Sequence, residues 1–185
     1  MAHIKTIEPE DAKGELKNVY DNLIETRGKI AEIHKIQSLN PDALATHMDL
    51  YMSIMFGKSP LKRYQREMIG VVVSAANKCT YCINHHEQAL LAYWKEEEKT
   101  RQLSKNRSEV ELTETDRLLC DLAEKLTLNI DQDYSLDIKK LQEIGLEDRA
   151  ILDAVQIIAY FNFVNRVVLG LGVEFTEEEV KGYRY

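Results

Sequence analysis

The chain has little of what marks β-rich, disulfide-stapled or polyanion-binding proteins. Its 185 residues include only three prolines and three cysteines, and no segment alternates apolar and polar residues for long. Positive charge is in deficit, because 24 Lys and Arg face 31 Asp and Glu, which gives a net charge of −7. No basic stripe offsets this balance, so we expect no surface for nucleic acid or for an anionic membrane.

Targeting signals are also missing from the sequence. The first residues contain no apolar run of the kind that a signal peptide carries. The longest apolar segment, 151–171, is interrupted by five polar residues, so we expect a buried helix there and not a membrane span. Three cysteines without a secretory signal indicate a reducing, cytoplasmic location, where a CxxC motif is more often catalytic or metal-binding than structural.

Helix signals are frequent, and with 44% hydrophobic and 30% charged residues they predict one soluble all-α domain over residues 1–185. N-caps, capping boxes and terminal glycines occur at Asn40-Pro41, Ser59-Pro60, Thr113-Asp116, Thr176-Glu179, Gly145, Gly170 and Gly172. The expected helices cover residues 10–27, 30–38, 41–56, 60–77, 79–94, 114–129, 135–144, 148–169 and 176–182.

Two of these helices are apolar on nearly every side, over residues 68–76 and 151–171. A chain of this size has limited room to bury both, so we expect part of their surface to be covered in a homo-oligomer. The intervening segment, 95–111, mixes charges of both signs and is interpreted as a solvated helix extension and loop.

The most informative motif is Cys79-Thr80-Tyr81-Cys82, followed by His86. On a helix, the two cysteines and the histidine fall on one face, and side chains at i and i+3 lie close enough to form a disulfide. If Asn77 caps this helix, Cys79 lies in its first turn, where the helix dipole favours a thiolate. A thiolate can attack a peroxide bond, and a neighbouring thiol can then close a disulfide.

Other interpretations of the motif remain open at this stage. Cys79, Cys82 and His86 would supply three ligands to zinc, but structural zinc normally has four, and no second pair follows in the sequence. Haem attachment requires histidine directly after the second cysteine, where Ile83 stands, and a thioredoxin-type motif requires a βαβ context. Cys120 has apolar helical neighbours and is interpreted as a buried, inert thiol.

The region around the motif resembles the alkyl hydroperoxidase D (AhpD)-like carboxymuconolactone decarboxylase superfamily, in its peroxidase-related branch. Redox members carry a glutamate, a cysteine twelve residues later, CxxC, and a histidine four residues after the second cysteine; here these are Glu67, Cys79, Cys82 and His86. The flanks 74–77 and 85–87 and the segment 160–172 are similar too. The decarboxylases of the superfamily lack this cysteine pair.

The resemblance implies an all-helical AhpD-like fold, with the redox motif in residues 41–94, and a trimer or hexamer. It implies that Cys82 is the peroxidatic cysteine and that Cys79 resolves it and faces the external reductant. Glu67 would end a proton relay that runs through His86 to the thiols. Some members have a histidine at the place of Tyr81, and His85 could partly substitute for it or face solvent.

We therefore expect a thiol-dependent peroxidase or peroxide-linked disulfide reductase without a bound cofactor. Its partners would be a hydroperoxide and an external dithiol, from a lipoyl protein or a thioredoxin-like donor, as the resemblance implies. The alternative is a non-catalytic redox sensor or zinc-binding protein that uses the same cluster. For the relay, the chain must turn back near Asn77-Lys78, because Glu67 and His86 then lie at comparable depth on two antiparallel helices.

Overall fold

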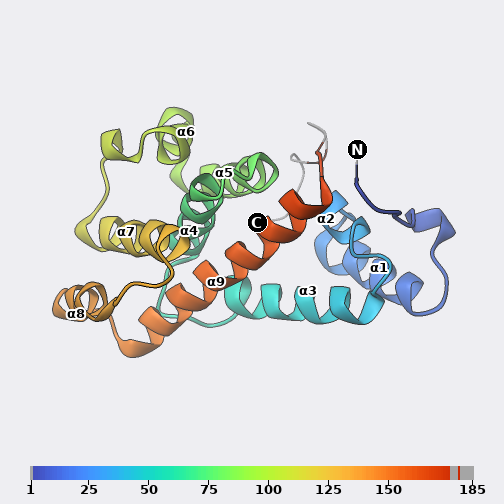
Figure 1. The fold of residues 1–185 in the computed structure, drawn as a ribbon, viewed down its shortest axis with the longest axis horizontal. Helices are drawn as coiled ribbons and strands as arrows, with labels where there is room; N and C mark the ends of the chain where they lie inside the picture. The colour runs from blue at the N-terminus through green and yellow to red at the C-terminus, as the bar shows by residue number, and fades with distance from the viewer. Residues whose placement is uncertain (1, 176–178, 180–185) are drawn as a thin grey trace.

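The computed structural model describes residues 2–175 and 179. The regular secondary structure of these residues is helical, with no strand. Figure 1 shows the arrangement, in which α4 and α5 form a central hairpin and α9 crosses it. The α-helices are α1 (Gly14–Arg27), α2 (Glu32–Lys35), α3 (Pro41–Phe56), α4 (Arg63–Ala76), α5 (Thr80–Trp94), α6 (Glu97–Lys105), α7 (Glu114–Leu128), α8 (Ser135–Glu143) and α9 (Asp148–Leu171), with 3-10 turns η1 (Pro9–Asp11) and η2 (Arg107–Glu109). The all-α prediction is confirmed for this part of the chain.

Helix α4 lies at the centre of the main hydrophobic core. It packs against α3, α5, α6, α7 and α9, and every residue from Gln65 to Ser74 is buried within the single chain. The apolar run of α4 therefore needs no second subunit to cover it, contrary to the reasoning from sequence. The homo-oligomer stays a prediction, and its physical argument now rests on α9 alone.

Helix α9 is half-covered. Its inner face carries core residues such as Ile157 and Phe161, whereas Leu152, Phe163 and Leu169 are each about half exposed. By length and composition alone it is the one helix of the described residues that could cross a membrane, and 44% of its most apolar window is buried. Burial of that kind is equally found in the core helix of a soluble protein.

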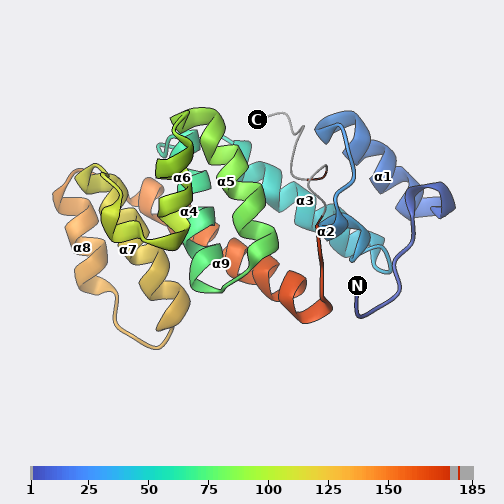
Figure 2. The ribbon, with the colours of Figure 1, turned by 90° about the horizontal axis from the view of Figure 1, so that it is seen from above.

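The N-terminal helices form a smaller cluster beside the hairpin. Leu16, Tyr20 and Leu23 on α1 pack against Leu44 on α3. Viewed from above in Figure 2, α1 and α2 lie on one side of α5 and α9, and α6, α7 and α8 lie on the other. The central hairpin therefore lies between these two groups of helices. On the N-terminal side, α3 packs against α4 of the hairpin.

The helix starts follow the sequence signals in two of the predicted places. Asn40 caps α3 by accepting from Ala43 N–H (3.1 Å), and Thr113 caps α7 by accepting from Asp116 N–H (3.2 Å). The cap predicted at Ser59-Pro60 is wrong, because α4 begins at Arg63. The Ser59 hydroxyl instead accepts from Leu61 N–H two residues on, in a local turn.

Two further segments differ from expectation. The stretch 95–111 contains α6, because Thr100 and Leu103, three residues apart, are buried, and α6 packs on α4 and α5. The helix expected over 30–38 shortens to the four residues of α2, followed by turns. The helix expected over 176–182 lies outside the described residues except for Glu179.

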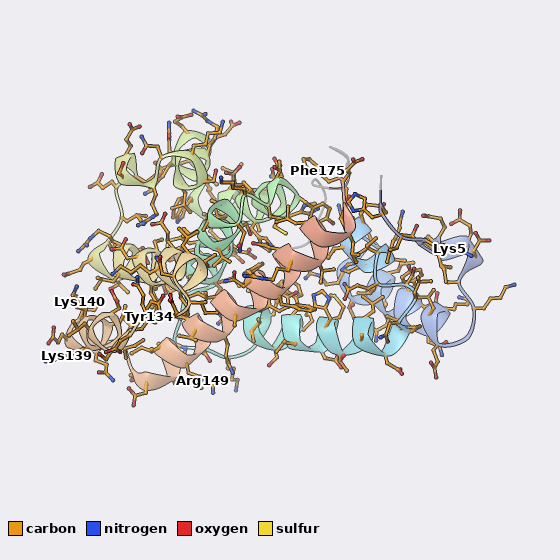
Figure 3. All side chains as sticks on the ribbon, viewed as in Figure 1. Lys5, Tyr134, Lys139, Lys140, Arg149 and Phe175 are labelled. Atoms are coloured by element: carbon orange, nitrogen blue, oxygen red, sulfur yellow. The ribbon has the colours of Figure 1, made fainter. Side chains whose placement is uncertain are left out.

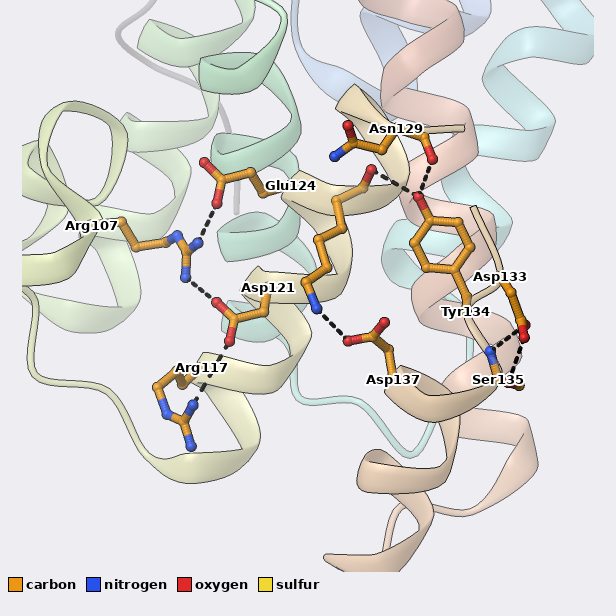
Figure 4. A network of polar contacts seen from close by, with 10 residues as sticks. Arg107, Arg117, Asp121, Glu124, Asn129, Asp133, Tyr134, Ser135 and Asp137 are labelled. Carbon is orange, nitrogen blue, oxygen red and sulfur yellow. Dashed lines mark hydrogen bonds and ion pairs between the residues drawn. The ribbon is translucent and has the colours of Figure 1, made fainter. Parts of the chain in front are cut away.

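Surface ion pairs join η2, α7 and α8. Arg107, the first residue of η2, pairs with Asp121 (2.6 Å) and with Glu124 on α7, and Lys125 pairs with Asp137 of α8 (2.6 Å), as Figure 4 shows. Figure 3 shows Lys139 and Lys140 at the α8 end of the molecule. We interpret this network as structural.

Candidate active site

The junction between α4 and α5 places the cysteines. Lys78 has φ +57°, a left-handed conformation that reverses the chain after Asn77, the C-cap of α4. Cys79 is the N-cap of α5, which begins at Thr80. The expectation that Asn77 caps α5 is therefore wrong: its amide instead donates to Asn162 Oδ1 and Asn165 Oδ1, both at 3.0 Å, and ties the junction to α9.

The two sulfur atoms of the motif lie 3.1 Å apart, within hydrogen-bond distance, and both residues are buried. A hydrogen bond from the Cys82 thiol lowers the pKa of Cys79 below its usual value. The same bond, together with burial, raises the pKa of Cys82 well above its usual value. The pair is thus arranged so that Cys79, at the helix N-terminus, takes a negative charge more readily than Cys82.

Glu67 and His86 meet across the hairpin, as the antiparallel return predicted. Glu67 Oε2 lies 2.6 Å from His86 Nδ1, and the carboxylate is only 1% exposed. Its other oxygen lies 2.6 Å from Arg63, one turn earlier on α4, which sequence reasoning missed. Burial by itself would raise the pKa of Glu67, but His86 and Arg63 outweigh it and hold that pKa below its usual value.

A close helix contact fixes the other side of the His86 ring. Phe161 of α9 packs edge-on against His86, with ring centroids 4.4 Å apart. This contact depends on Gly70, because a Cβ there would lie 2.8 Å from the Phe161 ring. The approach of α9 to α4 at a glycine therefore holds the imidazole between a carboxylate and an aromatic ring.

Tyr81 and His85 make their polar contacts with groups other than the Glu67–His86 pair. His85 Nδ1 lies 2.8 Å from the Tyr81 carbonyl oxygen, and its ring stacks on Tyr81 at 4.3 Å. The Tyr81 hydroxyl donates to Glu179 Oε1 (2.5 Å) and accepts from Ile33 N–H (3.2 Å). These two residues connect α5 to α2 and to Glu179.

Asn162, Asn165 and Arg166 form a polar patch on α9 beside the cysteine motif. Asn165 is fully buried and donates to the Ser74 hydroxyl (3.3 Å), and its hydrogen bond to Cys82 opposes the rise in that thiol's pKa. Asn162 also donates to Thr127 Oγ1 (3.0 Å), whereas Arg166 is exposed and contacts only Asn162 among the described residues. The two asparagines thus have a structural hydrogen-bonding role beside the cysteine motif.

The cysteines face different spaces. Cys82 lines a cavity of about 90 Å³, together with Glu67, His86 and the rings of Tyr51, Tyr160 and Phe161. Cys79 lines a separate surface hollow, formed with Lys78, Thr80 and the end of α9. A cavity of this size has room for a small organic molecule or several waters. Its walls also contain Arg27, His34 and His47, which no sequence motif singled out.

A weak signal for two of these residues was present in the sequence. His47 and Tyr51 stand one helical turn apart on the inner face of α3, with Leu44 one turn before them. That spacing is equally typical of ordinary core packing, so only the fold reveals that they line the same cavity as Cys82.

The third cysteine, Cys120, lies away from the Cys79–Cys82 pair. Cys120 on α7 is fully buried, and burial raises the pKa of its thiol far above the usual value, as expected of an inert cysteine. Within residues 2–175 and 179, no group of three or more His, Cys, Asp or Glu side chains is placed to hold a metal ion.

Comparisons with known proteins place the site in a family context. Residues 41–125 match the sequence model of the Carboxymuconolactone decarboxylase family. No curated protein matches the chain significantly. The structure of a peroxidase-related protein from Silicibacter sp. TM1040 is similar over 99% of this chain and 96% of its own, with 26% identity and a TM-score of 0.88.

Two further structures share the fold at lower identity. A peroxidase-related protein with an alkylhydroperoxidase AhpD core from Ralstonia eutropha JMP134 is 23% identical, over 97% of this chain and 94% of its own, with a TM-score of 0.87. The debrominase Bmp8, solved with 2,3,4-tribromopyrrole, is 16% identical over 97% of this chain and 96% of its own, with a TM-score of 0.80. The fold therefore hosts more than one chemistry.

Proposed function

Because this chain belongs to the carboxymuconolactone decarboxylase superfamily, with an AhpD-like fold, we propose that it is a thiol-dependent peroxidase that reduces organic hydroperoxides. The observation that carries the proposal is the division of the dithiol. Cys82 meets the ring-lined cavity that contains the Glu67–His86 pair, and its partner Cys79 meets a separate hollow. Substrate and reductant thus have different routes to one redox pair.

In the proposed first step, the cysteine pair loses one proton to His86. Glu67, held ionised by Arg63, stabilises the imidazolium that forms. The proton left in the pair moves across the 3.1 Å contact to Cys79, which leaves the thiolate on Cys82, inside the cavity.

The thiolate then attacks the outer oxygen of the hydroperoxide. A sulfur–oxygen bond forms, the O–O bond breaks, and His86 returns its proton to the departing alkoxide, giving an alcohol and Cys82 sulfenic acid. The Cys79 thiol attacks the sulfenic sulfur, and water leaves as the disulfide forms. An external dithiol, entering at the Cys79 hollow, reduces the disulfide; a lipoyl-bearing or thioredoxin-like donor in the cytoplasm fits this step.

The decisive experiment is steady-state reduction of tert-butyl and cumene hydroperoxide with a panel of dithiol donors. A brominated pyrrole belongs in the same panel, because a debrominase shares the fold. Turnover that requires both Cys79 and Cys82 supports the proposal. Metal analysis of the freshly purified protein tests the alternative, a zinc-binding or sensor protein: stoichiometric zinc with no thiol loss on peroxide treatment would establish that alternative instead.

A further inference from the structure

A chain of four polar groups runs from α2 to α9 and ends in the cavity that Cys82 lines. The Gln37 amide nitrogen donates to the Ile33 carbonyl oxygen (2.8 Å), so its amide oxygen is directed to His47 Nδ1 (3.0 Å). His47 Nε2 in turn lies 2.7 Å from the Tyr160 hydroxyl, across 113 residues of sequence. Both His47 and Tyr160 line the cavity.

These contacts fix where each proton lies. An amide oxygen only accepts, so His47 must carry its proton on Nδ1. Burial lowers the pKa of His47 to about 4, so the ring is neutral near pH 7 and its Nε2 can only accept. The Tyr160 hydroxyl must therefore donate its proton to His47.

The oxygen of Tyr160 keeps its own lone pairs available. No described residue donates a hydrogen bond to it, and burial raises the pKa of this phenol well above the usual value, so it stays uncharged. A buried hydroxyl whose proton is already committed can offer a ligand in the cavity only an acceptor. The nearby hydroxyl of Tyr51 differs, because it lies 3.5 Å from Arg27 Nη2 and has no histidine partner among the described residues.

His34, a second histidine that lines the cavity, carries its proton on the other ring nitrogen. Ala31 N–H donates to His34 Nδ1 (3.0 Å), and burial lowers the pKa of His34 to about 3, so the neutral ring carries its proton on Nε2. His34 is thereby set as a donor and Tyr160 as an acceptor. The cavity offers fixed, uncharged polar groups of both kinds among its aromatic walls.

We propose that Tyr160, oriented by His47 and Gln37, is a substrate-binding residue that accepts the O–H of an uncharged hydroperoxide. A hydroperoxide carries its single O–H on the outer oxygen, which is the atom that the Cys82 thiolate attacks. Acceptance by Tyr160 thus selects molecules with a donor at the reacting atom over dialkyl peroxides, which have none. This specificity rests on the proposed peroxidase function, but the acceptor site itself can be tested without turnover.

Phenol and fluorobenzene are suitable probes, since they have nearly the same shape and only phenol donates a hydrogen bond. We expect the reduced protein to bind phenol about five-fold more tightly in NMR titrations, the value of one ordinary hydrogen bond. Tyr160→Phe removes this preference, whereas Tyr51→Phe, the matched control from the same cavity, keeps it. Equal binding of the two probes by the unmodified protein, or a preference that survives Tyr160→Phe, would overturn the assignment.

Kinetics give a second measurement. Tyr160→Phe should raise the KM for tert-butyl hydroperoxide about five-fold. The same substitution should not change the rate at which methyl methanethiosulfonate modifies Cys82, because this reagent has no hydrogen-bond donor. An unchanged KM contradicts the inference. A clear phenol preference in a protein that reduces no hydroperoxide would keep the acceptor site and refute the peroxidase function, so the two failures are distinguishable.

Discussion

Glu67 Oε2 and His86 Nδ1 lie 2.6 Å apart although 19 residues separate them, because α5 folds back along α4 after Lys78. Arg63 approaches the same carboxylate from the other side. The buried carboxylate is thus shared between a permanent cation and a titratable imidazole. In the proposed mechanism, this pair accepts the proton that the two thiols lose.

Replacement of Glu67 with glutamine should slow thiol oxidation by peroxide about ten-fold or more and change its pH dependence, because the charge that stabilises protonated His86 is lost. Folding should be weakened by about 3 kcal/mol, since Arg63 loses its anionic partner. Stopped-flow oxidation between pH 5 and 9 measures the first effect. Glu87→Gln, on α5 and bonded to Ser104, is the matched control. Full activity with the original pH profile would remove Glu67 from the mechanism.

Replacement of Arg63 with methionine should raise the pKa of Glu67, because burial then faces only His86 as a counter-charge. In the wild type, that pKa lies below the usual 4.5, so the stability that Glu67 contributes is present above pH 4.5 and is lost as the pH falls through the folded-state value. Urea unfolding between pH 7 and pH 3 should therefore show a smaller loss in Arg63→Met, with Arg63→Lys close to wild type. Parallel curves for all three proteins would contradict this.

Mild oxidation should link Cys79 to Cys82 and leave Cys120 free, since the first two sulfurs are in contact and the third is buried on α7. In Cys82→Ser no sulfenic acid should form, and in Cys79→Ser it should persist because the resolving sulfur is missing. Peptide mapping and dimedone trapping report both results. Cys120 in the principal disulfide would overturn the pairing, and the reverse trapping pattern would exchange the two roles.

Replacement of Gly70 with alanine should cost about 1–3 kcal/mol and disturb the site at a distance. The new Cβ would lie 2.8 Å from the Phe161 ring, which packs on His86. Thermal unfolding measures the loss, and slower thiol oxidation should accompany it. Gly170→Ala, where a Cβ meets nothing within 4 Å, is the matched control.

A homo-oligomer is expected from sequence, and the exposed apolar residues of α9 are one surface that it can bury. Leu152, Phe163 and Leu169 are each about half exposed there, and burial of such side chains is favourable by about 25 cal/mol per Å². Sedimentation should show a species of two or more chains at micromolar concentration, with three-fold symmetry suggested by the family. Phe163→Glu should dissociate it. A monomeric wild type would refute the prediction.

Local sequence patterns were sufficient to predict the fold class and most of the helices of this protein. Helical periodicity and caps such as Asn40 and Thr113 determined the class and most helix positions, since both depend on neighbours in sequence. The i, i+3 spacing of Cys79 and Cys82 determined that their sulfurs would meet. Comparable lengths of chain on either side of Asn77-Lys78 predicted that Glu67 would lie near His86.

Tertiary structure decided the rest, because it depends on contacts between distant segments. The pairing of His47 with Tyr160 joins residues 113 apart, and no local pattern encodes it. Asn77 was expected to cap the following helix, but in the fold its amide donates to two amide oxygens on α9. Leu103 lies in a charged stretch that was expected to be a solvated helix extension and loop, but its burial stabilises a separate helix, α6. The sequence thus determined which chemical groups are present, and the packing of α3 and α9 around the hairpin decided which of them share a cavity with Cys82.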